Sequence, residues 1–535
     1  MTNPRLSRRA LLGSLSAGVA APLILNLLAI EDAAAQSAGA SADYRALVCV
    51  FLQGGNDSNN LLLATDPGSF AQYWTARFAG AEPIAIMPPG TPPVPIGQVS
   101  SVTKRTVTTP DMPEHWGGAL PIAVATPQPV PAANKVQGGP DTRSFALHPM
   151  LSGVQGLFAA GRAAAIANVG TLLAPLTKAQ YLAPTAAAPV PQRLFSHADQ
   201  QSAWQSGQVD GSATGWGGLM ADTFQAANPA PAFQAITTAG NTAFLSGVST
   251  RSFRVNYASD KASAQTITLA AQKGRYNQSD SFLDEFRLNL QEASLGFTQS
   301  SDMVMDYAEG VGRSIGGATT FDTALGAAGG PYTSVPKPPA FTDPISGKVA
   351  VNPLAGQLEA VVQTAAAHAA LGVGRQVFFV QLGGFDTHDG ENPRQGLLMA
   401  QLDHALAYLD QALTAAGLSD KLTAFTASDF NRTFTTNGDG TDHAWGGHHL
   451  IVGGAVKGGD VYGTYPTLGV DKAASGATPA FANPDAAGAA FIPTTSVETY
   501  LATMATWMGV TDAQLPGVFP RLAAFPVRNL GFMRS

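Results

Sequence analysis

The segment Gly384-Phe385-Asp386-Thr387-His388 places a carboxylate and an imidazole directly after the apolar run Val377–Leu382. Asp386 and His388 are two residues apart, so both side chains point the same way if the backbone is extended. A hard oxygen and an imidazole nitrogen aimed at one point are typical metal ligands. A polar turn with a helix cap explains the same residues, so this segment alone leaves both interpretations open.

Other apolar runs are also followed or preceded by carboxylates and imidazoles. Histidine is scarce, with nine in the chain, so its presence in several such loops is informative. Separate loops that each offer Asp or His beside an apolar strand predict a shared metal centre better than one loop could. The candidate set consists of Asp57, Asp386, His388, Asp429, Asp442 and His443.

The apolar runs themselves predict the elements that must position these side chains. Runs 46–52, 377–382 and 422–426 are typical of buried strands, and 397–413 has helical spacing. Strands alternating with helices predict an α/β fold, a mostly parallel sheet flanked by helices on both faces. Ligands in such sheets bind at the carboxyl ends of the strands, where these loops fall.

The domain organisation follows from composition. Residues 36–535 are predicted to form one large domain, with long loop-rich insertions at about 83–140 and 225–350, where Pro, Gly and Thr are frequent. Residues 1–35 are predicted to be a twin-arginine export signal, from Arg8-Arg9, an apolar run to Ile30 and the Ala33-Ala34-Ala35 cleavage site. A membrane anchor is the alternative. We expect a periplasmic or secreted mature protein without a membrane span.

Charge and cysteine content narrow the possible partners. The formal net charge is −7, which disfavours binding to nucleic acid, so no nucleic-acid partner is expected. The one cysteine, Cys49, lies inside an apolar strand and is predicted to be a buried structural thiol.

Several short motifs occur in a fixed order along the chain. They are Gln53-Gly54-Gly55-Asn56-Asp57, Phe195-Ser196-His197 with Trp204, Gly215-Trp216-Gly217, Gly384-Phe385-Asp386-Thr387-His388, Ser428-Asp429-Phe430-Asn431-Arg432-Thr433 and Gly440-Thr441-Asp442-His443. This ordered set resembles the Tat-exported bacterial family called domain of unknown function 1501, and the resemblance covers nearly the whole mature chain.

That family is placed in the alkaline phosphatase and sulfatase superfamily, whose members act on phosphate or sulfate esters with a nucleophile and usually two metals. The resemblance implies that Ser196 is the nucleophile at a helix start. It implies metal ligands at Asp57, Asp386, His388, Asp429 and His443. The chain departs from the superfamily at Phe430, which stands where a histidine ligand is expected.

The leading hypothesis is therefore an exported metal-dependent hydrolase of phosphate or sulfate esters. Ser196 or a metal-bound water would attack, and Arg432 would hold the anionic ester. One or two divalent ions (Zn, Mn, Ca or Mg) are expected. The alternative is a non-catalytic periplasmic binding or assembly factor on a degenerate phosphatase-like scaffold, working with a co-secreted protein. A third possibility, a carbohydrate- or polymer-acting protein, rests on Trp116, Trp204, Trp216 and Trp445.

Overall fold

The computed structural model describes residues 43–209, 211–224, 227–258, 261–264, 317–470 and 483–534. The export signal predicted for residues 1–35 lies outside the described residues, as does the centre of the second predicted insertion, 265–316.

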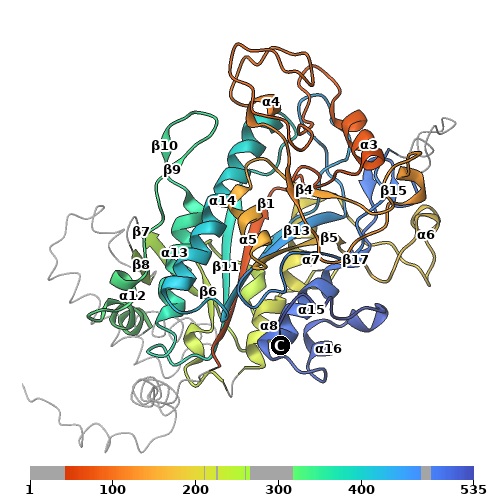
Figure 1. Ribbon diagram of the computed structural model, residues 1–535. Coiled ribbons are helices and arrows are strands. Elements are labelled where there is room, and N and C mark those ends of the chain that lie inside the picture. Colours follow the sequence, from red (N-terminus) through yellow and green to blue (C-terminus); the bar gives the residue numbers. More distant parts are fainter. Residues whose placement is uncertain are drawn as a thin grey trace, which may run out of the picture.

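A large mixed sheet forms the centre of the described chain (Figure 1). Its strand order is β14-β5-β13-β12-β1-β11-β6-β7-β8, with β17 paired to β5. Strands β1, β11, β12, β6 and β7 run parallel to their neighbours within this group, whereas β13 is antiparallel to both β12 and β5. The predicted α/β class with a mostly parallel sheet is confirmed. The strands are β1 Arg45–Gln53, β5 Ala163–Gly170, β6 Ala235–Thr237, β7 Phe253–Ala258, β8 Lys261–Ala264, β11 Arg375–Gly383, β12 Leu422–Ser428, β13 Gly447–Val452, β14 Val461–Tyr462 and β17 Thr495–Ser496.

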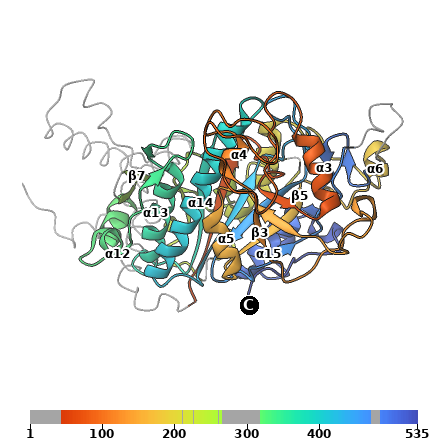
Figure 2. The same ribbon diagram turned by 45° about the horizontal axis from the view of Figure 1, so that its top comes forward.

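Helices cover both faces of this sheet (Figures 1 and 2). Helices α5 (Ser152–Ala159), α13 (Pro353–Ala366) and α14 (Glu391–Ala415) pack on one face. Helices α7 (His197–Ser206), α8 (Trp216–Asp222), α15 (Val497–Met508) and α16 (Leu515–Val518) pack on the other. Strand β1 shows why, because its successive side chains alternate between the two faces. Val48 and Val50 join the first hydrophobic core, and Cys49 and Phe51 join the second.

The first predicted insertion forms extended loops with a few short elements, at the top of Figure 1 around α4. A small antiparallel sheet, β2-β4-β3, supports these loops. The remaining elements are β2 Leu62–Ala64, α3 Pro67–Arg77, α4 Pro113–Trp116, β3 Leu120–Ile122, η2 Ala132–Asn134, β4 Phe145–Leu147, α6 Lys178–Leu182, η3 Pro231–Phe233, η4 Ala243–Leu245, α12 Pro331–Ser334, β9 Phe341–Thr342, β10 Val349–Ala350, β15 Ala486–Ala487, β16 Ala490–Phe491 and η6 Leu522–Ala524.

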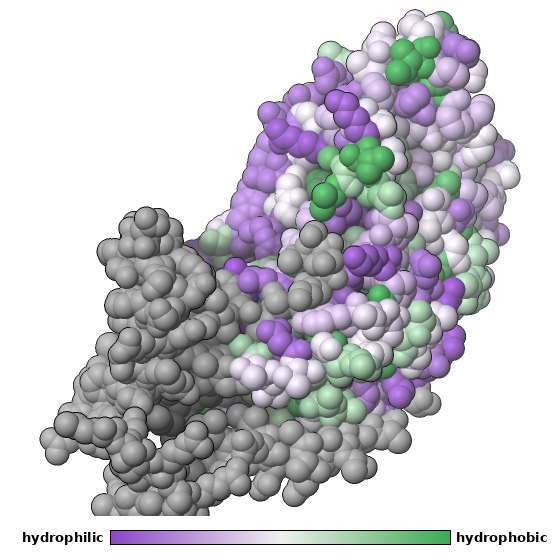
Figure 3. Space-filling model, turned by 90° about the vertical axis from the view of Figure 1, so that its left-hand side faces the viewer, coloured by the Kyte–Doolittle hydropathy of each residue, from purple (hydrophilic) through white to green (hydrophobic). Residues whose placement is uncertain are grey.

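The surface shown in Figure 3 mixes hydrophilic and hydrophobic side chains in small groups among its coloured residues. Within the described part of the chain, no helix has the length and apolar character needed to cross a membrane. Ligands of open α/β sheets bind at the carboxyl ends of the strands, so the loops at that edge of the central sheet form the candidate site.

Candidate metal centre

Three loops leave the same edge of the sheet because their strands are in register. Gln53 of β1 lies opposite Gly383 of β11, and Leu52 lies opposite Ser428 of β12. Gly54 follows β1 with a φ of +117°, and a Cβ there would lie 2.4 Å from the backbone nitrogen of Asp386. Only glycine permits this approach, which brings the Asp386 loop against the end of β1.

Three imidazoles converge on the Asp386 carboxylate. The Nε2 atoms of His197, His388 and His443 lie 3.5, 3.3 and 3.6 Å from Oδ1 of Asp386. His197 is the first residue of α7, and His443 lies in the loop before β13. Ligand atoms of His197, Asp386 and His443 all lie within 4.8 Å of one another, so this group could hold a metal ion.

The opposite ring nitrogens are each anchored to an acceptor. Nδ1 of His197 lies 2.6 Å from Oδ2 of Asp429, and Nδ1 of His443 lies 2.8 Å from the carbonyl oxygen of Phe195. Nδ1 of His388 lies 3.3 Å from Oδ1 of Asp442. A carbonyl or carboxylate oxygen only accepts hydrogen bonds, so each Nδ1 carries the proton. A metal-binding histidine is typically fixed in this way through its second nitrogen.

When the imidazoles are neutral, this tautomer leaves three unprotonated Nε2 atoms facing one carboxylate oxygen. The Nε2 atoms of His388 and His443, 2.9 Å apart, then each carry a lone pair. Nε2 of His197 is buried and has no hydrogen-bond partner among the described residues. Acceptors crowded together in this way repel one another unless a cation lies between them. The residues present therefore fit a metal ion.

The electrostatics of the ligand groups suit a cation. Burial works to raise the pKa of Asp386, but the hydrogen bond and charge of Arg432 hold it below its ordinary value. Burial lowers the pKa of His443, and the neighbouring charge of Arg432 adds to the effect. An ionised carboxylate and a neutral imidazole are the forms that bind metals.

Arg432 is buried and its donors are used within the protein. Its guanidinium donates to the carbonyl oxygens of Gly54, Gly55 and Thr441 and to Oδ1 of Asp386. It thus ties two loops together and orients the Asp386 carboxylate. The sequence prediction gave Arg432 the role of holding an anionic substrate, and the structure instead places it beneath the ligands.

Phe430 directly follows Asp429, at the position where a histidine ligand is expected from the sequence. Its ring centroid lies 4.8 Å from that of His197 and 4.4 Å from that of His443. Gly55 makes room for it, because a Cβ there would lie 2.4 Å from the Phe430 ring. Phe430 is therefore an apolar wall that holds two imidazoles in place.

Asp57 and Asp429, both predicted as ligands, have other contacts. Asp57 is fully buried, and its two carboxylate oxygens accept hydrogen bonds from the guanidinium of Arg77, with Nη2 2.8 Å from Oδ1. Burial works to raise the pKa of Asp57, but the charge and hydrogen bonds of Arg77 oppose burial, and the pKa lies below its ordinary value. Asp429 is also buried and contacts His197 on the side away from Asp386. The structure thus brings together Asp386, His388 and His443 of the predicted ligands, and places Asp429 behind them.

Ser196 stands at the N-cap of α7, as the sequence predicts for a helix start. Its hydroxyl donates to Oδ2 of Asp199 at 2.6 Å rather than to the backbone of the helix. Hydrogen bonds from Ser196 and Arg193 hold the pKa of Asp199 below its usual value.

His197 is the ligand candidate that sequence reasoning missed. In the sequence, His197 stands out only as part of the motif Phe195-Ser196-His197. Two signals could have identified it: histidine is scarce in this chain, and His197 follows a serine at a predicted helix start. The tryptophans considered for carbohydrate binding are mostly in the core, since Trp204, Trp216 and Trp445 are buried.

The family model "Protein of unknown function (DUF1501)" matches residues 44–481, which include every residue of this centre. The chain belongs to this family. None of the curated proteins compared with the chain matches it. Among solved structures, the crystal structure of Ps i-CgsB in complex with k-i-k-neocarrahexaose aligns over 68% of this chain and 68% of that chain. The identity is 9% and the TM-score 0.27, a likeness that carries no argument about function.

Proposed function

We propose that this DUF1501 member is an exported, metal-dependent hydrolase of phosphate or sulfate esters, on an alkaline phosphatase-like scaffold. The observation that supports it best is the convergence of three Nε2 atoms on Oδ1 of Asp386, with every Nδ1 anchored. Export by the twin-arginine route to the periplasm or beyond is part of the proposal. It rests on the sequence of residues 1–35.

The donor set favours one kind of metal. Imidazole nitrogens suit zinc and other first-row transition metals, whereas Ca²⁺ and Mg²⁺ prefer oxygen ligands. Two imidazoles and one carboxylate form the group, and a third imidazole, that of His388, lies 3.3 Å from the same carboxylate oxygen, so we propose a single site for Zn²⁺ or a similar ion. A second metal site is not part of the proposal, because Asp57 is bound to Arg77 and Phe430 offers no ligand atom.

A metal held there would polarise the ester oxygens and favour attack on the phosphorus or sulfur atom. Residues around the ligands hold the ligand side chains in the orientation that such a metal would need. Arg432 and Asp429 orient Asp386 and His197, and Phe430 excludes water from one side of the imidazoles. Ser196 is the candidate nucleophile, because a proton leaving its hydroxyl has an acceptor, Asp199, at 2.6 Å. A water molecule is the alternative nucleophile.

The test is hydrolysis of a panel of phosphate and sulfate esters by the zinc-loaded protein. If Ser196 is the nucleophile, Ser196→Ala should lower kcat by about a thousandfold or more, while metal content stays as in the wild type. Retained turnover would instead assign the attack to water. A wild-type protein that holds its metal but hydrolyses no ester in the panel would contradict the proposal.

A second candidate function is a non-catalytic binding or assembly factor. It is favoured by the state of Arg432, whose guanidinium is buried and bonded to three carbonyl groups, leaving it poorly placed to hold a substrate anion. Under this proposal one co-secreted protein should co-purify with the wild type, and no ester should be cleaved. Ester cleavage that is lost in Asp386→Ala would reject it.

A further inference from the structure

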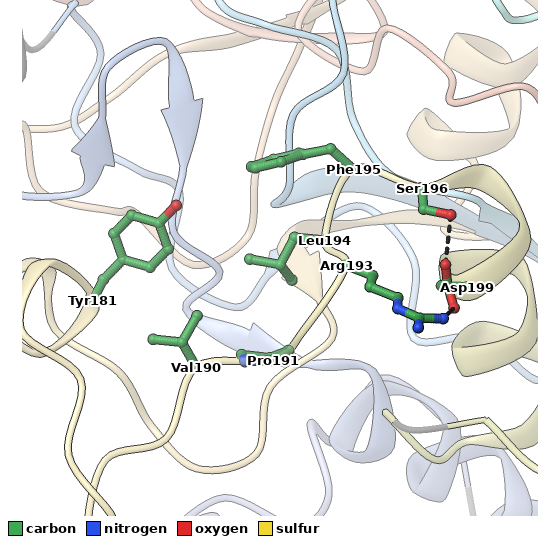
Figure 4. Close-up of a pocket in the computed structure, with 8 residues that line it drawn as sticks. All are labelled: Tyr181, Val190, Pro191, Arg193, Leu194, Phe195, Ser196 and Asp199. Atoms are coloured by element: carbon green, nitrogen blue, oxygen red, sulfur yellow. Dashed lines mark hydrogen bonds and ion pairs between the residues drawn. The ribbon is translucent and has the colours of Figure 1, made fainter.

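An open cavity of about 540 Å³ lies at the start of α7, the helix whose first residue is His197. Figure 4 shows the side chains that line it. Its lining comes from the segment before α7 and the first turn of that helix, together with Tyr181 of α6. The volume lies within the range of sites that bind small organic molecules, about 300–1,000 Å³. The lining residues are Tyr181, Val190, Pro191, Arg193, Leu194, Phe195, Ser196 and Asp199.

One wall of the cavity is apolar and rigid. Tyr181, Val190 and Leu194 belong to a small hydrophobic cluster around Trp445. The rings of Tyr181 and Trp445 are 5.7 Å apart, so a buried tryptophan supports this wall from behind. Phe195 extends over the cavity, and 43% of its surface is exposed. An exposed phenyl group beside such a wall is a natural contact for an apolar ring.

The opposite wall is polar, and its side chains form hydrogen bonds with one another. Asp199 accepts from Ser196 at 2.6 Å and from Nη1 of Arg193 at 3.0 Å, as Figure 4 shows. Arg193 holds a φ of 54°, in the left-handed region that non-glycine residues rarely adopt. The energetic cost of this conformation indicates that the position of the segment is imposed by the surrounding structure.

The cavity is joined to the metal centre through the backbone of the same segment. The carbonyl oxygen of Phe195 accepts from Nδ1 of His443 at 2.8 Å. Ser196, which lines the cavity, directly precedes His197. A ligand in the cavity would therefore lie next to the proposed nucleophile, Ser196, and against the segment whose backbone anchors His443.

We propose that this cavity binds the alcohol part of the ester and selects an apolar ring, so that the preferred substrates are aryl esters. The inference rests on the proposed hydrolase function and specifies its substrate class. The side chains of Val190, Pro191 and Leu194 offer no hydrogen bond to the hydroxyls of a sugar or polyol, which would lose their hydration without replacement. An aryl ring loses little hydration and contacts Phe195 and Tyr181.

The test uses non-hydrolysable anions, so that binding is read separately from turnover. Phenylphosphonate and benzenesulfonate are titrated calorimetrically into the zinc-loaded protein, each against its methyl counterpart. At least one phenyl anion should bind about tenfold or more tightly than its methyl counterpart. Phe195→Ala should remove that difference, because it deletes the ring but keeps the carbonyl group that binds His443. Leu182→Ala is the matched control, an exposed apolar side chain next to Tyr181 that does not line the cavity.

Equal binding of the phenyl and methyl anions would overturn the aryl subsite and leave the hydrolase proposal standing. Binding of none of the four anions would overturn both. Tighter binding of the non-hydrolysable phosphonate analogue of glucose 1-phosphate than of phenylphosphonate would also overturn the subsite, in favour of a sugar. A loss of the phenyl preference in Leu182→Ala as large as that in Phe195→Ala would show that the cavity is not the source of selectivity.

Discussion

The three histidines at Asp386 differ from two histidines of the core in which ring nitrogen carries the proton. In His197, His388 and His443, Nδ1 faces an acceptor and Nε2 faces the Asp386 carboxylate. In the core, the arrangement is reversed for His148 and His448. Their Nδ1 atoms accept hydrogen bonds from the backbone nitrogens of Met150 and Asn168. Their Nε2 atoms are buried without a partner among the described residues.

The third core histidine, His449, is packed between aromatic rings, with centroids 4.8 Å from Trp204 and 5.8 Å from Tyr500. Burial lowers the pKa of each core histidine to about 3. The core group therefore stays neutral and serves packing, whereas the first group aims three lone pairs at one point. The tautomer set by the second nitrogen, more than the residue type, separates a ligand from a core histidine.

The largest expected effect concerns Asp57, one of the aspartates predicted from the sequence to be metal ligands. Asp57→Asn should lower the free energy of unfolding by about 3 kcal/mol, because it breaks a buried ion pair and leaves Arg77 without its closest counterion. Metal content of the folded variant should not change. Chemical denaturation and elemental analysis together check this. The control, Asp43→Asn, removes an exposed ion pair with Arg375 and should cost less than about 1 kcal/mol. Loss of metal from folded Asp57→Asn would instead identify Asp57 as a ligand of the metal centre.

The next effect is a pH dependence from the core group. The pKa of His148 is about 3 in the folded state, below the ordinary value near 6.5, so the unfolded chain binds a proton that the folded one does not. Its contribution is fully present above about pH 6.5 and is lost as the pH falls towards 3. Between pH 7 and 5, wild-type stability should fall by about 2 kcal/mol more than that of His148→Gln. Urea unfolding at both pH values measures the difference, and equal losses in the two proteins would contradict a neutral His148.

The smallest effect tests the anchoring of the first group. Asp429→Asn should weaken metal binding by about tenfold, because it removes the charged acceptor that orients His197. Asp442→Asn should have a weaker effect, since its contact with His388 is longer, 3.3 Å, and more exposed. Competition with a zinc chelator gives both affinities. An Asp442→Asn effect larger than that of Asp429→Asn would reverse the assigned order of anchoring.

Much of the fold could be predicted from the apolar runs. The predicted strands 46–52 and 422–426 match β1 and β12 closely, and the predicted helix 397–413 lies within α14. Parallel strands place their carboxyl ends at one edge, so the meeting of the Asp386 and Asp429 loops followed from topology. These strands are buried on both faces, so each one appears in the sequence as a continuous apolar run that is easy to recognise.

The details of the centre depended on long-range partners that residue types do not reveal. Asp57 follows a strand as the ligands do, but Arg77 reaches it from α3 and takes both of its oxygens. His197 becomes a ligand candidate only because Asp429, 232 residues away, fixes its ring. The sequence also does not reveal that Arg432 is buried, because arginine is usually a surface residue and this one lies beneath the site.

The most direct test is the metal content of protein purified without a histidine tag, compared between one histidine from each group. We predict about one equivalent of zinc or a similar ion in the wild type and in His449→Gln, and less than about a tenth of that in His443→Gln. The core variant controls for misfolding, because it alters a buried imidazole that packs against Trp204 and Tyr500. A wild-type protein without bound metal, or equal metal in the two variants, would contradict the central claim.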